Sequence, residues 1–317
     1  MQPRIGRWLM AASMLMLAMA PAAASACSAK NVLYDNGASG PLYADLYGPA
    51  TPPPPGGYPA VLLIHGGGWA AGDKSWYQNY GPSFANQGYL AMAINYPLAM
   101  ANDPSTTWPA QANAVDAAVA FLRANAAQCN VNAAMIAAVG ESAGGHLAAW
   151  QGSLDSALPN RVGAVVAFAA PWDLTVEQPQ APGSTCGVND DFSTCAAECK
   201  ALVPGNACIY NLLGTGNLVA RTSASPIHRI GMQSAPTLLI HGTVDSIVPC
   251  GQSKKVENKL LAVPRPVFHA YLAAQGHPDL AHGFPNPPSL WLEPTFQFLN
   301  WWRGGPPPSN AGTCNPQ

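Results

Sequence analysis

The chain alternates largely apolar runs with segments of helical periodicity. The apolar runs occupy residues 59–64, 90–95, 135–139, 162–169, 237–242 and 267–272. Runs of this kind are typical of parallel strands that are buried on both faces of a sheet. Between two of them, Val115, Val119 and Leu122 recur at helical spacing within 110–125, and 253–261 is a second helical segment. The alternation predicts an α/β fold, with a mostly parallel central sheet flanked by helices.

Two further patterns mark the limits of this domain. Short strands are predicted at 32–34 and 42–47, joined by a Gly-rich turn, and 290–302 is predicted to be a closing amphipathic helix. The length is enough for one large α/β domain, which we expect over 27–303. A Pro- and Gly-rich tail follows at 304–317.

A Cys-rich segment at 174–222 interrupts the alternation of strands and helices. It is rich in Pro, Gly and Asp, lacks a sustained period, and contains Cys186, Cys195, Cys199 and Cys208. It lies between two predicted core strands, on the side of the sheet where we expect the catalytic loops. We predict that this insertion is a disulfide-tied lid or cap over a site, and a plain surface loop is the alternative.

The first 26 residues have the three-part layout of a secretory signal peptide. Arg4 and Arg7 precede an apolar stretch at 8–20, and small residues at 24–26 supply a cleavage point. The apolar stretch is shorter than the roughly 20 residues that span a bilayer. The pattern predicts a signal peptide over 1–26 and a secreted or periplasmic protein.

The eight cysteines favour disulfides over metal sites in a chain with an export signal. Only Cys195 and Cys199 approach a metal-ligand spacing. The sequence has no matching pair of histidines to complete a zinc site with them. Cys27 follows the predicted cleavage point directly, so it is either disulfide-bonded, for example to Cys314, or the anchor of a lipoprotein. Ala24 stands where a typical lipobox has Leu, which disfavours the anchor. Membrane attachment is expected only if Cys27 is lipidated.

Charge argues against one class of partner. Charged residues make up 9% of the chain and its net charge is −2. The sequence has no cluster of Lys and Arg suited to contacting a phosphate backbone, so we expect no nucleic-acid binding. The oligomeric state does not follow from the residues.

A nucleophile turn is predicted at Ser142. The apolar run at 135–139 ends in a Gly-x-Ser-x-Gly motif at 140–144, and an Ala-rich helix follows. The motif alone is weak in a chain with 30 glycines. The strand before it and the helix after it are the context that it requires, because a tight turn between them exposes the serine hydroxyl at the edge of a sheet.

A serine nucleophile needs a base, and the base needs a carboxylate to orient it. Asp245 directly follows the predicted strand at 237–242, and His282 lies in the loop beyond the last strand. The order Ser142, Asp245, His282 is that of an α/β-hydrolase triad. His277 lies closer to the strand and is the alternative base. We prefer His282, because the glycine after it relieves crowding and the longer loop is able to bend back toward the serine.

An oxyanion loop is predicted at 65–68, where a His-Gly-Gly-Gly sequence ends the first buried run. Attack on an ester creates a negative oxygen that needs preorganised donors, and glycines present main-chain N–H groups without side chains in the way. The N–H of Ala143 adds a donor at the start of the helix. His65 itself is expected to anchor the loop, and His146 to pack on its helix.

Two tryptophans follow predicted core strands. Trp69 and Trp172 are candidate linings of the acyl or alcohol pocket, and aromatic packing under a loop is an equal alternative. Position in the sequence does not separate these two roles.

The motifs together resemble those of bacterial esterases of the α/β-hydrolase superfamily. They are His-Gly-Gly-Gly-Trp at 65–69, Gly-Glu-Ser-Ala-Gly-Gly-His-Leu-Ala at 140–148, Ser-Pro-Ile at 225–227, His-Gly-Thr-x-Asp-x-x-Val-Pro at 241–249 and His-Gly-Phe at 282–284. The resemblance covers roughly 60–302 and is greatest to hormone-sensitive-lipase-like carboxylesterases and to feruloyl and acetylxylan esterases. It implies an α/β-hydrolase fold and an oxyanion hole formed by Gly67, Gly68 and Ala143. The insertion replaces or remodels the usual cap, and the loop at 273–281 looks longer than usual.

The expected protein is therefore a secreted serine carboxylesterase that acts through an acyl-enzyme intermediate. Its substrates are expected to be small-molecule or polymer-linked esters, such as short-chain acyl or plant cell-wall esters, and no metal or organic cofactor is needed. One alternative is a serine peptidase of the same superfamily, a class that usually carries a large additional domain. The other is a non-catalytic hydrolase-fold binding module, a class that commonly loses the serine or the histidine.

Overall fold

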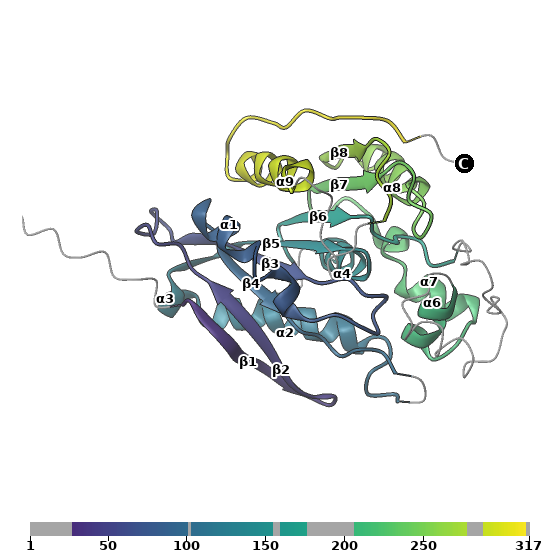
Figure 1. Ribbon diagram of the computed structural model, residues 1–317, viewed down its shortest axis with the longest axis horizontal. Coiled ribbons are helices and arrows are strands. Elements are labelled where there is room, and N and C mark those ends of the chain that lie inside the picture. The colour runs from purple at the N-terminus through teal and green to yellow at the C-terminus, as the bar shows by residue number, and fades with distance from the viewer. Residues whose placement is uncertain (1–26, 101–102, 155–158, 176–205, 278–287, 315–317) are drawn as a thin grey trace, which may run out of the picture.

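A single twisted sheet forms the centre of the molecule (Figure 1). The computed structural model describes residues 27–100, 103–154, 159–175, 206–277 and 288–314. The strands within these ranges are β1 (Ala29–Gly37), β2 (Gly40–Tyr47), β3 (Tyr58–Ile64), β4 (Leu90–Ile94), β5 (Val131–Glu141), β6 (Ala164–Phe168), β7 (Thr237–Gly242) and β8 (Val267–Leu272). Their order across the sheet is β1-β2-β4-β3-β5-β6-β7-β8. β2 pairs antiparallel with β1 and β4, and from β4 to β8 every pairing is parallel.

Helices cover both faces of this sheet. They are η1 (Lys74–Tyr77), α1 (Gly81–Asn86), α2 (Ala110–Ala124), α3 (Ala126–Cys129), α4 (Ala143–Gly152), α6 (Asn206–Leu213), α7 (Leu218–Ala224), η2 (Pro226–Arg229), α8 (Gly251–Ala262) and α9 (Ser289–Trp302). Residues of α2, α4 and α8 belong to the hydrophobic core on one face. Residues of η1, α1 and α9 belong to the core on the other face. The predicted α/β architecture is therefore confirmed.

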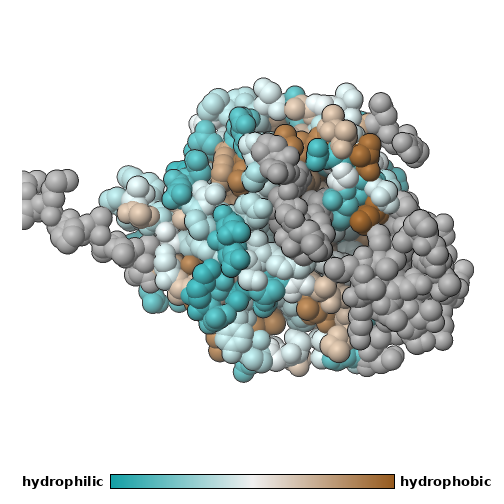
Figure 2. Space-filling view, in the orientation of Figure 1, coloured by the Kyte–Doolittle hydropathy of each residue, from teal (hydrophilic) through white to brown (hydrophobic). Residues whose placement is uncertain are grey.

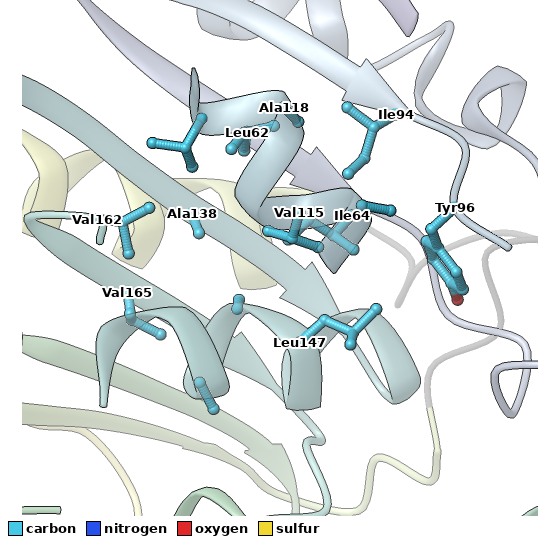
Figure 3. Close-up of a cluster of buried hydrophobic side chains, with 14 of the residues drawn as sticks. Leu62, Ile64, Ile94, Tyr96, Val115, Ala118, Ala138, Leu147, Val162 and Val165 are labelled. Atoms are coloured by element: carbon cyan, nitrogen blue, oxygen red, sulfur yellow. The ribbon is translucent and has the colours of Figure 1, made fainter. Parts of the chain in front are cut away.

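The continuous apolar character of β3 follows from this double coverage. Leu62 and Ile64 pack into the core with α2 and α4, whereas Val61 and Leu63 pack into the core on the opposite face. All four side chains are fully buried. Figure 3 shows Leu62 and Ile64 near Val115 and Ala118 of α2, in the same buried cluster as Leu147 of α4. A strand covered on both faces has no position for a polar side chain.

The two disulfides with both partners described connect the first part and the last part of the described residues to the body of the domain. Cys27 is bonded to Cys129, at the end of α3, and Cys314 is bonded to Cys250, immediately before α8. The suggested Cys27–Cys314 pairing is therefore wrong. β1 and β8 form opposite edges of the sheet, seven inter-strand steps of about 4.8 Å apart. A disulfide spans a Cα–Cα distance of only about 4.4–6.8 Å.

The C-terminal tail runs along the outer edge of β8 (Figure 1). The N–H of Tyr271 donates to Ala311 O at 2.8 Å, and the N–H of Ala311 donates to His269 O at 3.0 Å. These bonds, with the disulfide of Cys314, hold the tail as an additional short bridge on the edge strand.

The predicted lid at 174–222 lies only partly within the described residues. Residues 176–205, with three of its four cysteines, fall outside them, and Cys208 on α6 is disulfide-bonded. Helix α6 is held against the loop before α2, because Asn211 donates to Ala99 O at 2.7 Å and the N–H of Trp108 donates to Leu212 O at 2.7 Å. The role of the insertion as a lid stays a prediction.

The predicted signal peptide over 1–26 also falls outside the described residues. In the part of the chain that the structure covers, no helix has the length and apolar character needed to cross a membrane. On the face shown in Figure 2, hydrophilic and hydrophobic residues are interspersed.

Candidate active site

Ser142 occupies a sharp turn between β5 and α4. Its backbone has φ 52° and ψ −119°, a sparsely populated conformation for a residue with a side chain. The turn is held in place because the N–H of Ser142 donates to Phe168 O at 2.8 Å and its carbonyl accepts from the N–H of His146 at 2.9 Å. This is the strained strand-to-helix turn that the Gly-x-Ser-x-Gly motif predicts.

The two glycines of the motif are required by close backbone contacts. A Cβ atom on Gly140 would lie 2.2 Å from Gly144 O, and one on Gly144 would lie 2.0 Å from Ile64 O. The nucleophile turn is therefore packed directly against the end of β3, where the oxyanion loop begins.

A chain of hydrogen bonds connects the serine to a histidine and a buried carboxylate. His277 Nε2 lies 2.9 Å from Ser142 Oγ, and His277 Nδ1 lies 2.8 Å from Asp245 Oδ2. A carboxylate at Nδ1 favours the tautomer in which Nδ1 carries the proton and Nε2 is free to accept one from the serine. The geometry is that of a nucleophile, its general base and the carboxylate that orients the base.

The preference for His282 as the base is corrected by this geometry. His277 holds the position between Ser142 and Asp245, and His282 lies outside the described residues. The loop after β8 folds directly over the end of β7, so a short excursion is enough to reach the serine. The N–H of Val244 donates to Gln275 O at 3.1 Å and fixes this loop beside the acid.

The carboxylate of Asp245 is buried and saturated with donors. Its Oδ1 accepts from the N–H groups of Ile247 and Val248, both at 2.9 Å, and its Oδ2 faces His277 and His241. Burial alone would raise the pKa of Asp245, but the hydrogen bonds and charges of His241 and His277 outweigh burial and hold that pKa well below its ordinary value. Asp245 therefore stays ionised at neutral pH.

The predicted oxyanion loop is fixed by partners around its first glycine. The N–H of Gly66 donates to Glu141 Oε2 at 2.9 Å, so this donor is already used within the protein. The hydroxyl of Tyr96 donates to the carbonyls of His65 and Gly66, at 2.9 and 3.1 Å. Gly67, with φ 99°, accepts from two later N–H groups and turns the chain sharply.

Gly68 and Ala143 are the other predicted oxyanion donors. Gly68 has φ 56° and follows the turn at Gly67, and Ala143 is the first residue of α4, directly after the nucleophile. Gly144 packs the start of this helix against Ile64 and His65, the residues that lead into the glycine loop, and the donor role of Gly68 and Ala143 stays a prediction.

Two histidines near the site are structural. His65 is fully buried and stacks on Tyr96 with 4.3 Å between ring centroids, and burial lowers its pKa to about 4. His146 is fully buried, contacts Ala224 O at 2.8 Å, and has its pKa lowered by burial to about 4. Both rings are neutral at pH 7, in agreement with the expected anchoring and packing roles.

The two tryptophans are packed inside the protein. Trp69 is 4% exposed and its Nε1–H donates to His146 Nδ1 at 3.2 Å, which ties the oxyanion loop to the nucleophile helix. Trp172 is 2% exposed, and its main-chain N–H donates to Gln252 Oε1 at 3.1 Å. For both residues the packing alternative describes what the structure shows.

Two residues of this site are not predicted from the sequence. Glu141 occupies the variable position of the serine motif, so no local signal marked it as the partner of Gly66. His241 is part of the sequence motif that contains Asp245, but the motif does not indicate any role for it. Its contact with the carboxylate forms only when the loop between the two residues is folded. Over the described ranges, no group of three or more His, Cys, Asp or Glu side chains is arranged to hold a metal ion.

The strand order, the serine turn and the Ser–His–Asp arrangement together define an α/β-hydrolase. The chain belongs to the BD-FAE family, whose sequence profile matches residues 44–260. The predicted resemblance to esterases of the hormone-sensitive-lipase-like and feruloyl-esterase-like group is thereby confirmed.

Named relatives and solved structures agree with this assignment. Esterase LipC of Mycobacterium tuberculosis is 29% identical over 247 residues, which are 71% of this chain and 53% of LipC. The probable carboxylic ester hydrolase LipM of the same organism is 29% identical over 222 residues, 69% of this chain and 49% of LipM. The chain thus spans about half the length of the curated relatives it matches.

The similar structures establish the fold. A propionate-bound esterase of the planctomycete Thermogutta terrifontis superposes with a TM-score of 0.65 at 22% identity, over 87% of this chain and 93% of that one. A truncated carbohydrate esterase from gut microbiota has a TM-score of 0.65 at 23% identity, over 89% and 98%. The α/β-hydrolase fold expected from the sequence is confirmed.

Proposed function

We propose that this protein is a serine carboxylesterase that uses Ser142, His277 and Asp245. The observation that carries the proposal is the continuous hydrogen-bonded chain from Ser142 Oγ through His277 to Asp245 Oδ2. Membership of the BD-FAE family and the esterase names of the relatives support ester hydrolysis as the reaction.

The proposed reaction has two stages, acylation of Ser142 and hydrolysis of the acyl-enzyme. His277 Nε2 accepts the proton of Ser142 Oγ as this oxygen forms a bond to the ester carbonyl carbon. The tetrahedral intermediate collapses, the bond to the alcohol oxygen breaks, and His277 gives its proton to that alcohol. A water molecule then loses a proton to His277 and attacks the acyl-enzyme, which releases the acid and returns the proton to Ser142 Oγ.

Asp245 stabilises the imidazolium that forms in each stage. Its carboxylate is ionised, buried and held by main-chain donors, so it keeps the ring oriented without taking its proton.

The oxyanion is proposed to rest on the N–H groups of Gly67, Gly68 and Ala143. The N–H of Gly66 is already donated to Glu141, which supports the choice of the two later glycines. The positive φ angles of Gly67 and Gly68 turn the loop sharply after that anchored residue. Removing one such donor from an oxyanion hole costs roughly 10²–10³ in kcat.

Short acyl esters, including those carried by carbohydrates, are the proposed substrates. The solved relatives include an esterase bound to propionate and to butyrate, and a carbohydrate esterase. A protein of Bacteroides eggerthii described as a bifunctional GH43-CE is 26% identical over 88% of this chain, with a TM-score of 0.67.

Export to an oxidising compartment is also proposed. The signal-peptide pattern at 1–26 and the disulfides Cys27–Cys129 and Cys250–Cys314 support it, because such bonds persist in secreted and periplasmic proteins. The Sγ atom of Cys27 is bonded to Cys129, and lipidation would modify that same atom.

The test combines a covalent probe with turnover. We expect a fluorophosphonate to form an adduct on Ser142, located by peptide mass spectrometry, and Ser142→Ala to lose about 10⁶-fold in kcat with p-nitrophenyl acetate. Activity that survives Ser142→Ala, or no adduct at Ser142, would exclude the mechanism. Peptide p-nitroanilides assayed in parallel address the peptidase alternative, and hydrolysis of these alone would favour it. A folded protein without any turnover would favour a binding module.

A further inference from the structure

A second imidazole lies behind the carboxylate of Asp245. His241, the penultimate residue of β7, is fully buried, and its Nε2 lies 2.7 Å from Val248 O and 3.4 Å from Asp245 Oδ2. Its Nδ1 lies 2.7 Å from Ser253 Oγ on α8. The ring therefore connects three elements: the end of β7, the loop that carries Asp245, and the first turn of α8.

The position of the ring proton follows from these partners. A carbonyl oxygen only accepts hydrogen bonds, so the contact with Val248 O requires a proton on His241 Nε2. The same nitrogen lies 3.4 Å from Asp245 Oδ2, within the distance of an ion pair. In the neutral ring, Nδ1 accepts from the Ser253 hydroxyl, which sets the plane of the imidazole.

The carboxylate is thereby held on every side. Two main-chain N–H groups hold Asp245 Oδ1, while Oδ2 lies between His277 at 2.8 Å and His241 at 3.4 Å. Without His241, Oδ2 would keep one side-chain contact among the described residues, the one to His277. The loop would also lose the bond at Val248 O that closes residues 241–248.

We propose that His241 is a positioning residue of the triad, which fixes the Asp245 carboxylate toward His277. This inference rests on the proposed esterase function, and it assigns His241 no contact with the substrate. His241 acts through Asp245: an acid held in one place keeps the His277 ring aligned with Ser142 Oγ. Misplacement of reacting groups by about 1 Å costs on the order of 100-fold in rate.

Substitution of His241 tests the proposal. We expect His241→Leu to lower kcat by about 100-fold with KM changed less than about threefold, because ground-state binding does not use the acid. His241→Gln is expected to restore at least about tenfold of that loss, since its amide nitrogen is able to take the place of Nε2 as a donor. The matched control is His269→Leu on the neighbouring strand β8. His269 lies near Glu257, at 3.2 Å, and we expect its replacement to leave kcat within about twofold.

A second pair of variants keeps the test valid if His241→Leu does not fold. The shorter amide of His241→Asn does not reach the Nε2 position, so its kcat is expected to fall well below that of His241→Gln. Equal kcat values for the Asn and Gln variants, or a wild-type kcat for His241→Leu, would overturn the proposal. An equal loss of kcat in His241→Leu and His241→Gln would also overturn the proposal, because a merely structural role of His241 predicts equal losses.

Coupling to the acid gives an independent readout. In an Asp245→Asn background, His241→Leu should lower kcat by less than about threefold, since the carboxylate that it positions is already gone. Fully multiplicative losses would contradict the proposed route through Asp245. These results are distinct from a failure of the esterase mechanism, which would appear as turnover retained by Ser142→Ala whatever the His241 variants do.

Discussion

His277 Nε2 lies 2.9 Å from Ser142 Oγ, although the two residues are 135 positions apart in the chain. The contact joins the turn after β5 to the loop after β8, on strands separated in the sheet by β6 and β7. Both loops leave the carboxyl ends of parallel strands, so they meet at one edge of the sheet. The base of the proposed triad is therefore set by how these loops fold together.

The first prediction concerns the identity of the base. We expect His277→Ala to lower kcat by about 10⁴–10⁶-fold, because within the described residues His277 is the side chain that bridges Asp245 and Ser142. His282→Ala, the matched control, should stay within about threefold of wild type. Initial rates with p-nitrophenyl acetate measure both. Loss of turnover in His282→Ala alone would reverse the assignment.

A second prediction concerns the anchor of the oxyanion loop. Glu141→Ala leaves the buried N–H of Gly66 without its acceptor, which costs about 1–3 kcal/mol in the free energy of unfolding. We also expect kcat to fall about tenfold, because Gly67 and Gly68 follow this residue directly. Glu141→Gln keeps an acceptor oxygen and should recover most of both losses. Urea denaturation and esterase rates decide the matter, and identical behaviour of the two variants would contradict it.

The third prediction is a loss of stability in acid. Burial lowers the pKa of His65 and of His146 to about 4, below the ordinary 6.5, so between these values the unfolded chain binds more protons than the folded one. Each histidine therefore lowers the free energy of unfolding by up to about 1.4 kcal/mol per pH unit as the pH falls from 6.5 toward 4. Urea titrations from pH 7 to pH 5 measure this slope.

The control for acid sensitivity is His146→Gln. Gln does not titrate, so the variant should show a slope shallower by about 1 kcal/mol per pH unit below pH 6, whatever its stability at pH 7. An unchanged slope would mean that His146 is protonated in the folded protein.

The fourth prediction concerns the bond between Cys250 and Cys314. It closes a loop of 64 residues, and the chain-entropy model assigns about 4 kcal/mol to a loop of this length. We expect a Cys250→Ser/Cys314→Ser double variant to lose up to that amount in the free energy of unfolding. Urea denaturation under non-reducing conditions measures it. A loss below about 1 kcal/mol would show that the hydrogen bonds of Ala311 hold the tail without the disulfide.

Much of the fold and two of the three triad residues follow from local sequence. The apolar run at 59–64 predicts a strand buried on both faces, and Leu62 and Leu63 indeed face opposite cores. Ser142 is identified because its strand, turn and helix are contiguous, and Asp245 because it directly follows a buried strand. Each of these signals lies within a few residues of the position that it marks.

Tertiary structure alone decided which distant groups meet. Sequence favoured His282, but the loop after β8 is bonded to the end of β7, and this places His277 at the serine. Cys27 and Cys314 lie at opposite edges of the sheet, a separation visible only once the strand order is known. The sequence by itself determined the strands, the serine turn and the acid, because local patterning specifies them. Three features depended on distances in the folded protein: the identity of the base, the disulfide partners, and the contact of His241 with Asp245. Spacing along the chain does not specify such distances.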